Sequence, residues 1–193
     1  MAAARNTPTP PAGPAPTEAT LHEAALSYLA RYGTTRAGLI RVLDRRVDRW
    51  ARAAEADPEA ADAARAAVRV VADGLVQAGA VDDAAFAASR ARGLSRAGRS
   101  HRAIEAHLRA RGVDAGIARD AVADDPDREL AAALAFARRR RIGPFRREEL
   151  EPDAALRELG MMARAGYGRD VANTALRMDA DEATDRINQA RTA

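Results

Sequence analysis

Apolar residues recur at helical spacing along most of this chain, in short stretches that glycine, proline or aspartate interrupt. After Thr35, for example, the apolar positions that share one helix face are Leu39, Ile40, Leu43, Val47 and Trp50. Abundant alanine, leucine, arginine and glutamate, with an aromatic content of only 4%, also favour helix over strand. The sequence therefore predicts an all-α fold made of short helices.

Capping residues and helix breakers divide these helices into groups. Asp57-Pro58, Ser100 and Asp114 each precede an apolar helical pattern, as side chains that accept the first free amides of a helix do. We expect about nine helices in three groups of three. The expected parts are a disordered Pro/Ala-rich tail at 1–20, a first three-helix repeat at 21–81, a second at 82–124, a third at 126–178, and a polar C-terminal tail at 179–193.

The second and third groups resemble each other internally. When Gly112 is placed on Gly166, Leu108 falls on Met162 and the apolar residues of the next helix coincide, whereas Ile104 falls on Glu158. In the third repeat, Leu156, Leu159 and Met162 are expected to face the core. Because units this small bury little surface alone, they must stack, and we expect tandem helix-turn-helix-like repeats in an elongated, curved molecule.

Arginine is the only basic side chain besides histidine, because all 31 Lys+Arg residues are arginine. It is concentrated in two runs, which supply the candidate partner- or DNA-binding residues Arg90, Arg92, Arg96, Arg99, Arg102, Arg109, Arg111, Arg138, Arg139, Arg140, Arg141, Arg146 and Arg147. A guanidinium can bind either a carboxylate or a phosphate through two hydrogen bonds, so these runs indicate an acidic protein surface or DNA. The alternative is that they are solvated helix faces of an arginine-rich chain.

Phosphate could also bind at the helix that starts after Ser100, because a helix N-terminus offers free amides. His101 and His107 lie on the same helix and could contact such a group. Asp82 and Asp83 form an acidic pair, but their place at a helix start favours capping over catalysis or metal binding.

Other residue patterns exclude most enzyme classes. Cysteine is absent and the three histidines are scattered, so we expect no metal site and no cofactor. No phosphate-binding glycine loop and no nucleophile elbow is present, so we do not expect an enzyme. No apolar run approaches the ~20 residues that span a bilayer, and the N-terminus has no secretory pattern, so we expect a cytoplasmic protein without membrane contact.

Four segments, in this order, resemble the RecX family. They are ALSYLAR at 25–31 with Thr35, Arg36 and Leu39; GAVDDAAFA at 79–87; Arg102-Ala103-Ile104 with Leu108 and Arg111-Gly112-Val113; and Ala165-Gly166-Tyr167 with Val171 and Ala175-Leu176. The resemblance covers roughly residues 21–178. It departs from the family pattern at Ala80, where an aromatic residue is usual, and at Ala165, where arginine is common.

The resemblance implies tandem three-helix modules that bind the RecA recombinase filament and inhibit its ATPase, strand-exchange and coprotease activities. It places the chain in recombination, DNA repair and the SOS response, with single- or double-stranded DNA as a secondary partner and a monomer as the default state. The alternative is an autonomous arginine-rich helical DNA-binding protein. That alternative needs a base-reading side chain on a recognition helix, and Asn173 is the one candidate amide in the repeats.

Overall fold

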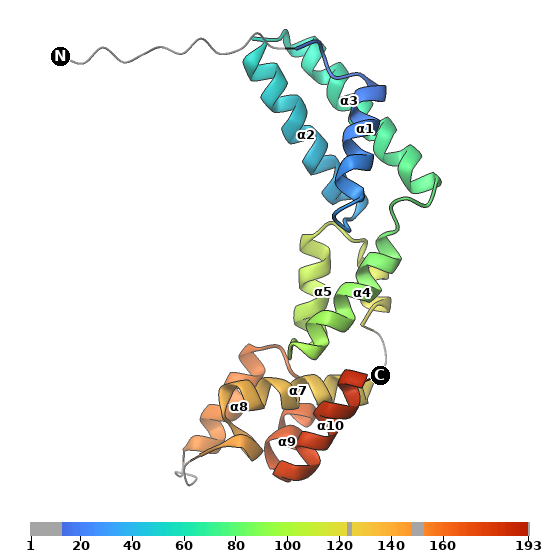
Figure 1. Ribbon diagram of the computed structural model, residues 1–193. Coiled ribbons are helices and arrows are strands. Elements are labelled where there is room, and N and C mark those ends of the chain that lie inside the picture. The colour runs from blue at the N-terminus through green and yellow to red at the C-terminus, as the bar shows by residue number, and fades with distance from the viewer. Residues whose placement is uncertain (1–12, 123–124, 148–152, 193) are drawn as a thin grey trace, which may run out of the picture. The chain divides into compact units, whose positions relative to one another are not determined.

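The computed structural model describes residues 13–122, 125–147 and 153–192, and every regular element in these ranges is helical (Figure 1). The predicted all-α fold is therefore confirmed. The chain divides into two compact units, Met1–Asp83 and Ala84–Ala193.

The first unit is a three-helix module of α1 (Glu18–Leu29), α2 (Arg36–Ala53) and α3 (Pro58–Gln77). Helix α1 starts inside the stretch that we expected to be a tail through residue 20. The reason is a local capping box, in which Thr17 accepts the amide of Thr20 and the hydroxyl of Thr20 accepts the amide of Thr17. The rest of the predicted tail, residues 1–12, lies outside the described residues.

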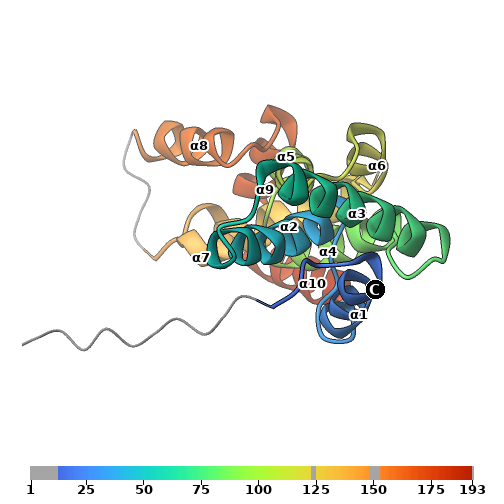
Figure 2. The same ribbon diagram turned by 90° about the horizontal axis from the view of Figure 1, so that it is seen from above.

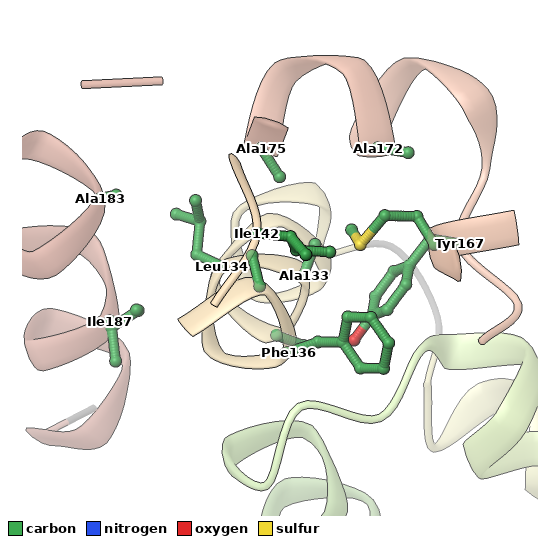
Figure 3. Packing of buried hydrophobic residues seen from close by; sticks show 12 residues of the cluster. Ala133, Leu134, Phe136, Ile142, Tyr167, Ala172, Ala175, Ala183 and Ile187 are labelled. Carbon is green, nitrogen blue, oxygen red and sulfur yellow. The ribbon is translucent and has the colours of Figure 1, made fainter. Parts of the chain in front are cut away.

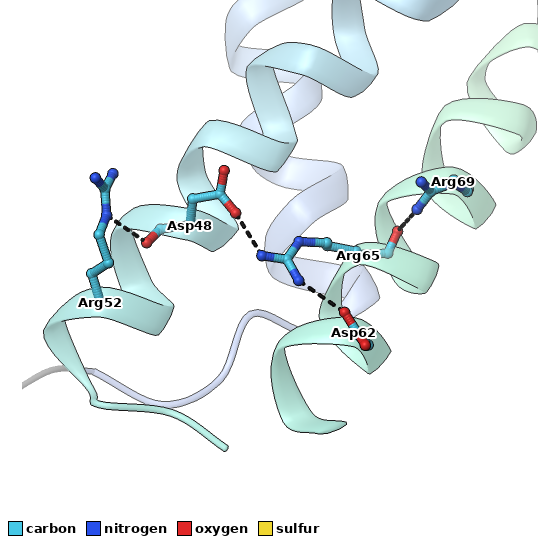
Figure 4. Close-up of polar contacts among 5 residues, drawn as sticks. All are labelled: Asp48, Arg52, Asp62, Arg65 and Arg69. Carbon is cyan, nitrogen blue, oxygen red and sulfur yellow. Dashed lines mark hydrogen bonds and ion pairs between the residues drawn. The ribbon is translucent and has the colours of Figure 1, made fainter. Parts of the chain in front are cut away.

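The core of this first module lies between α2 and α3, which run side by side (Figure 2). The predicted stripe of α2 supplies Leu39, Leu43 and Val47, each at most 1% exposed, and Val68 of α3 is fully buried against them. Thr35 caps α2 and Asp57 caps α3, as the sequence predicts. Polar side chains also join the two helices, because Arg65 of α3 pairs with Asp48 of α2 (Figure 4).

The second unit begins with a smaller three-helix module, which starts at the boundary with α4 (Asp83–Arg96) and continues with α5 (His101–Ala110) and α6 (Ala115–Asp120). Its buried side chains are small or aliphatic and include Ala87, Ala91, Ile104, Leu108, Val113 and Ala118. Ser100 and Asp114 cap α5 and α6 as predicted. Gly98 turns the chain between α4 and α5 at a φ of 74°, a conformation that favours glycine.

The remainder of the second unit, the third module, consists of α7 (Pro126–Arg140), the short 3₁₀ helix η1 (Gly143–Phe145), α8 (Ala154–Arg164), α9 (Arg169–Arg177) and α10 (Ala180–Thr192). Helix α7 is central and packs against both α9 and α10. Its Leu134 and Phe136 are buried together with Met162 and Tyr167 (Figure 3). The rings of Phe136 and Tyr167 lie 5.7 Å apart at a tilt of 59°.

The predicted polar tail at 179–193 is wrong, since residues 180–192 form α10. Asp179 accepts the amides of Asp181 and Glu182 and so starts the helix. Ala183 and Ile187, one turn apart, are 0% and 3% exposed in the core against α7. Two apolar residues on a polar stretch were too weak a pattern to reveal this packing from the sequence.

The internal repeat is reproduced in three dimensions. Gly112 and Gly166 have φ of 85° and 92°, and Leu108 and Met162 are both fully buried. The mismatch between Ile104 and Glu158 is also real, because Glu158 lies at a core position and is only 7% exposed. The prediction that Leu156 faces the core is wrong, as this side chain is 74% exposed on α8.

Candidate interaction surface

The second module presents its arginines to solvent. The seven candidates of the first run, Arg90, Arg92, Arg96, Arg99, Arg102, Arg109 and Arg111, are all exposed. Within the described ranges, no ion pair joins Arg92, Arg96, Arg99, Arg102 or Arg109 to a carboxylate. These guanidinium groups therefore keep their hydrogen-bond donors available for a partner.

Several arginines of the first module are engaged internally instead. Arg65 lies between two carboxylates, 2.9 Å from Asp48 and 2.8 Å from Asp62, and Arg36 pairs with Asp73 (Figure 4 shows the Arg65 contacts). These hydrogen bonds raise the pKa of the Arg65 and Arg36 guanidinium groups above their usual value. The contrast with the second module shows that arginine content alone does not define a binding surface.

The second arginine run divides between exposed and internal positions. Arg139 and Arg140 lie over the ring of Phe136, at 5.6 and 5.7 Å from its centre, while both remain exposed. Arg141 ends α7 at a φ of 57° and is exposed, as is Arg147, and Arg138 is half-buried.

Arg146 differs from its neighbours because it points into the third module. Its Nη2 lies 2.6 Å from Oε2 of Glu158, and the amide of Gly143 donates to the same oxygen at 3.1 Å. The side chains of Arg146 and Glu158 are only 27% and 10% exposed. Arg146 therefore stabilises the fold of this module, and we leave it out of the candidate surface.

The phosphate site that we expected at Ser100 is excluded by side chains from the third module. Ser100 is fully buried, accepts the amide of Ala103 and donates to the carbonyl of Ala165 at 2.7 Å. Glu129 accepts the next amide, that of His101, at 2.9 Å. Two of the free amides of this helix start are thus occupied by protein groups, one of them a carboxylate that would repel phosphate.

Side chains that donate to main-chain carbonyls fix the second module against the third within the same unit. Arg139 donates to the carbonyl of Ala97, and Ser100 donates to the carbonyl of Ala165. A Cβ on Gly98 would lie 2.8 Å from the backbone nitrogen of Phe136, so only glycine allows this approach. The two arginine runs are consequently held on one body.

Arg99 lies in the turn between α4 and α5, and its charge acts on His107 of the second module and on Tyr167 of the third. It lowers the pKa of His107 together with Arg90 and Arg111, after burial as the largest cause. It also acts, with Arg139, on Tyr167, although burial raises the pKa of that phenol far above its usual value. The hydroxyl of Tyr167 is buried and has no hydrogen-bond partner in the described part of the chain.

A groove of about 860 Å³ runs beside α4, α7 and α10. Its lining includes Arg92 and Arg96 of α4, Arg191 of α10, and the apolar residues Ala131, Ala132 and Ile187. Carboxylates also line it, and two of them are paired with arginine, Asp125 with Arg128 and Asp127 with Arg186. The groove therefore has mixed charge.

Sequence reasoning did not place Glu129, Arg191 or Tyr167 beside the first arginine run. Arg191 lay in the predicted tail, and Glu129 reaches His101 across 28 positions of the chain. The match of Gly166-Tyr167 to Gly112-Val113 was the one signal that placed Tyr167 at a buried turn, since Val113 and Tyr167 are 4% and 5% exposed.

Metal ligands and membrane spans were also searched for in the described residues. No three His, Asp or Glu side chains come close enough together there to hold a metal ion. Of the helices in these ranges, none has both the length and the apolar character that crossing a bilayer requires.

Comparison with known proteins gives one consistent family. Residues 82–122 match the second three-helix domain of RecX. The chain is 38% identical over 155 residues to the regulatory protein RecX of Myxococcus xanthus, covering 79% of this chain and 81% of that protein.

Two solved structures share the fold. One, described as the crystal structure of regulatory protein RecX, superposes with a TM-score of 0.63 at 20% identity, covering 82% of this chain and 70% of that one. The crystal structure of RecX from Lactobacillus salivarius superposes with a TM-score of 0.59 at 16% identity, covering 82% of this chain and 94% of that one.

Proposed function

Because this chain belongs to the RecX family, we propose that it binds the RecA filament on DNA and inhibits its ATPase, strand-exchange and coprotease activities. In this proposal the chain acts by binding and catalyses no reaction. RecA is the main partner, DNA is a secondary one, and the protein acts as a monomer in the cytoplasm.

The observation that carries this proposal is the exposed arginine set of the second module, in which Arg92, Arg96, Arg99, Arg102 and Arg109 make no ion pair within the described ranges. It lies in residues 82–122, the stretch that matches the RecX domain. A surface rich in guanidinium groups attracts acidic protein surfaces and phosphate over a distance set by salt, and accelerates association. The same surface also fixes orientation, because each arginine can bind a carboxylate through two parallel hydrogen bonds.

The test is the rate of ATP hydrolysis by RecA on single-stranded DNA, with this protein added below one copy per RecA. We expect the rate to fall, and the fall to weaken as salt is raised. Arg96→Glu combined with Arg102→Glu reverses charge at two exposed positions, and we expect it to abolish most of the inhibition. Arg31→Glu, an exposed position in the first unit, serves as the matched control.

The same titration separates the proposal from the DNA-binding alternative. Unchanged RecA hydrolysis, together with a sequence-specific footprint on DNA in the absence of RecA, would reject the filament regulator and support an autonomous DNA-binding protein.

A further inference from the structure

One face of α4 lines the groove beside α4, α7 and α10. Arg92, Ser95 and Arg96 stand at positions i, i+3 and i+4 of this helix, so they share a face, and all three line the groove. Both guanidinium groups are exposed and pair with no carboxylate of the described ranges. Ser95 is only 4% exposed, and no hydrogen bond joins its hydroxyl to another described residue. This face of α4 therefore presents donors that the described part of the fold does not use.

The carboxylates of the groove are mostly neutralised within the fold. Two arginines offset three of the four lining carboxylates, in the pairs Asp125–Arg128, Asp127–Arg186 and Glu182–Arg186. The other two charged residues that α10 contributes to the lining, Asp185 and Arg191, are opposite in sign. Within the described residues, the positive charge of α4 is therefore left without a counterion.

The rest of the lining is largely apolar and small. It includes Ala131, Ala132 and Ala135 of α7, with Ile187 and Ala190 of α10. Because alanine side chains are short, they leave room above them, and the groove has a volume of about 860 Å³. This volume lies within the range of roughly 300–1,000 Å³ that is usual for binding clefts. An apolar side chain placed here would be removed from water against these carbons.

We propose that this groove binds a short peptide segment of a partner protein, with a carboxylate against the donors of α4 and an apolar side chain against the alanines of α7. A carboxylate has two acceptor oxygens, so it can accept from a guanidinium and a hydroxyl at once. This inference rests on the proposed function in taking the partner to be a protein. It deepens that function by naming the surface of contact and the kind of segment that it takes.

The mixed charge of the groove favours a peptide over a nucleic acid. A phosphate backbone is charged at every nucleotide, so a strand lying in the groove would bring phosphates close to the carboxylates of α7 and α10. A peptide can instead place one carboxylate at α4 and cover the rest of the lining with neutral side chains.

The experiment selects binders from a random peptide library displayed on phage, with the full-length protein as bait. The enriched peptides are then synthesised with a fluorescent label, and their affinity is measured by fluorescence polarisation. We expect enriched peptides to carry an acidic residue close to a large apolar one. A labelled oligodeoxythymidine strand serves as the nucleic-acid probe, and we expect the selected peptides not to compete with it.

Variants of the groove identify where the selected peptides bind. Arg92→Gln combined with Arg96→Gln should weaken binding on the order of tenfold, as loss of charge-assisted hydrogen bonds does. Ala190→Leu should also weaken it, because the longer side chain fills part of the groove. Arg119→Gln combined with Arg169→Gln removes the same charge from exposed positions outside the lining and should leave the affinity unchanged. Thermal unfolding of each variant checks that the fold is retained.

Three results would overturn the inference. The first is a selection that enriches no peptide, or only peptides without an acidic residue. The second is an affinity that the groove variants leave at the level of the control. The third is competition between the oligodeoxythymidine strand and the peptides, with both weakened by the double variant of α4, which would assign the groove to nucleic acid.

RecA hydrolysis measured with the same variants separates this inference from the proposed function. Peptide binding in the groove without any effect of the wild type on RecA would reject the proposed function alone. Inhibition of RecA that persists in variants unable to bind the peptides would reject the groove as the contact and leave the proposed function standing.

Discussion

Arg146 and Glu158 form an ion pair that lies mostly out of solvent, with Nη2 of the arginine 2.6 Å from Oε2 of the glutamate. Glu158 occupies the position that corresponds to Ile104 in the second module. An ion pair therefore replaces an apolar contact at an equivalent core position. The carboxylate also accepts the amide of Gly143, so it joins α8 to the turn that follows α7. Removing one member leaves the other half-buried without its partner.

We therefore predict that Glu158→Ala lowers the free energy of unfolding by about 2–4 kcal/mol, because it leaves the guanidinium of Arg146 and the amide of Gly143 without their acceptor. Urea unfolding followed by circular dichroism measures this loss. Arg147→Gln, at the exposed neighbour of Arg146, should change stability by less than about 0.5 kcal/mol. Equal stability of Glu158→Ala and the wild type would show that the pair contributes nothing.

Glycines in and after α4 provide a second, matched comparison. Gly98 has a φ of 74° and would place a Cβ 2.8 Å from the backbone of Phe136, whereas a Cβ on Gly93 meets nothing within 4 Å. Gly98→Ala should cost about 2 kcal/mol or more, since both the conformation and the space oppose it. Gly93→Ala should add up to about 1 kcal/mol, as alanine does in an exposed helix interior. Thermal unfolding of the two variants should therefore shift in opposite directions.

The third prediction concerns α8 and α10. Ile187 is 3% exposed in the core and Leu156 is 74% exposed. Ile187→Ala should cost about 2–4 kcal/mol, as truncation of a buried aliphatic side chain does. Leu156→Ala should be close to neutral, although the sequence pattern places it in the core. If Ile187→Ala proved neutral in urea unfolding, the packing of α10 on α7 would be refuted.

The fourth prediction concerns acid sensitivity. Burial and nearby arginines lower the pKa of His101 and His107 below the ordinary value of 6.5. Below that value the unfolded chain binds protons that the folded chain does not, so stability should fall as the pH drops from ~7 to ~5.5. His101→Gln and His107→Gln should each reduce this dependence, while His22→Gln, at an exposed position, should not.

Glu129 acts in the opposite sense, because burial raises the pKa of its carboxyl group, which favours the folded state as the pH falls toward that raised value. Its Oε2 lies 3.4 Å from Nε2 of His101, so His101→Gln also alters this carboxylate, whereas His107→Gln leaves it in place. Urea unfolding at each pH measures the effect, and identical slopes for the wild type and the His107→Gln variant would contradict it.

The sequence predicts what is encoded locally. Thr35, Asp57, Ser100 and Asp114 cap the helices that follow them, because a cap depends on residues two or three positions away. The apolar stripe of α2 is buried for the same reason, since its spacing is a property of one helix.

Contacts between residues that lie far apart in the sequence cannot be predicted in this way. Glu129 accepts the amide of His101, from which it is 28 positions away in the chain, and Glu158 pairs with Arg146 across 12 positions. The sequence shows that both acidic residues are present, but it does not show which donors the fold brings close to them. Leu156 fits a helical stripe as well as Met162 does, and only the placement of neighbouring helices decides which of them is covered.

The joint between the second and third modules uses main-chain acceptors: the side chains of Arg139 and Ser100 donate to the carbonyls of Ala97 and Ala165, and the backbone of Phe136 lies beside Gly98. A carbonyl keeps its position whichever side chain its residue carries, so substitutions at Ala97 and Ala165 leave the acceptors of this joint in place. Arginines that take no part in the joint can therefore be changed without disturbing the frame that presents them.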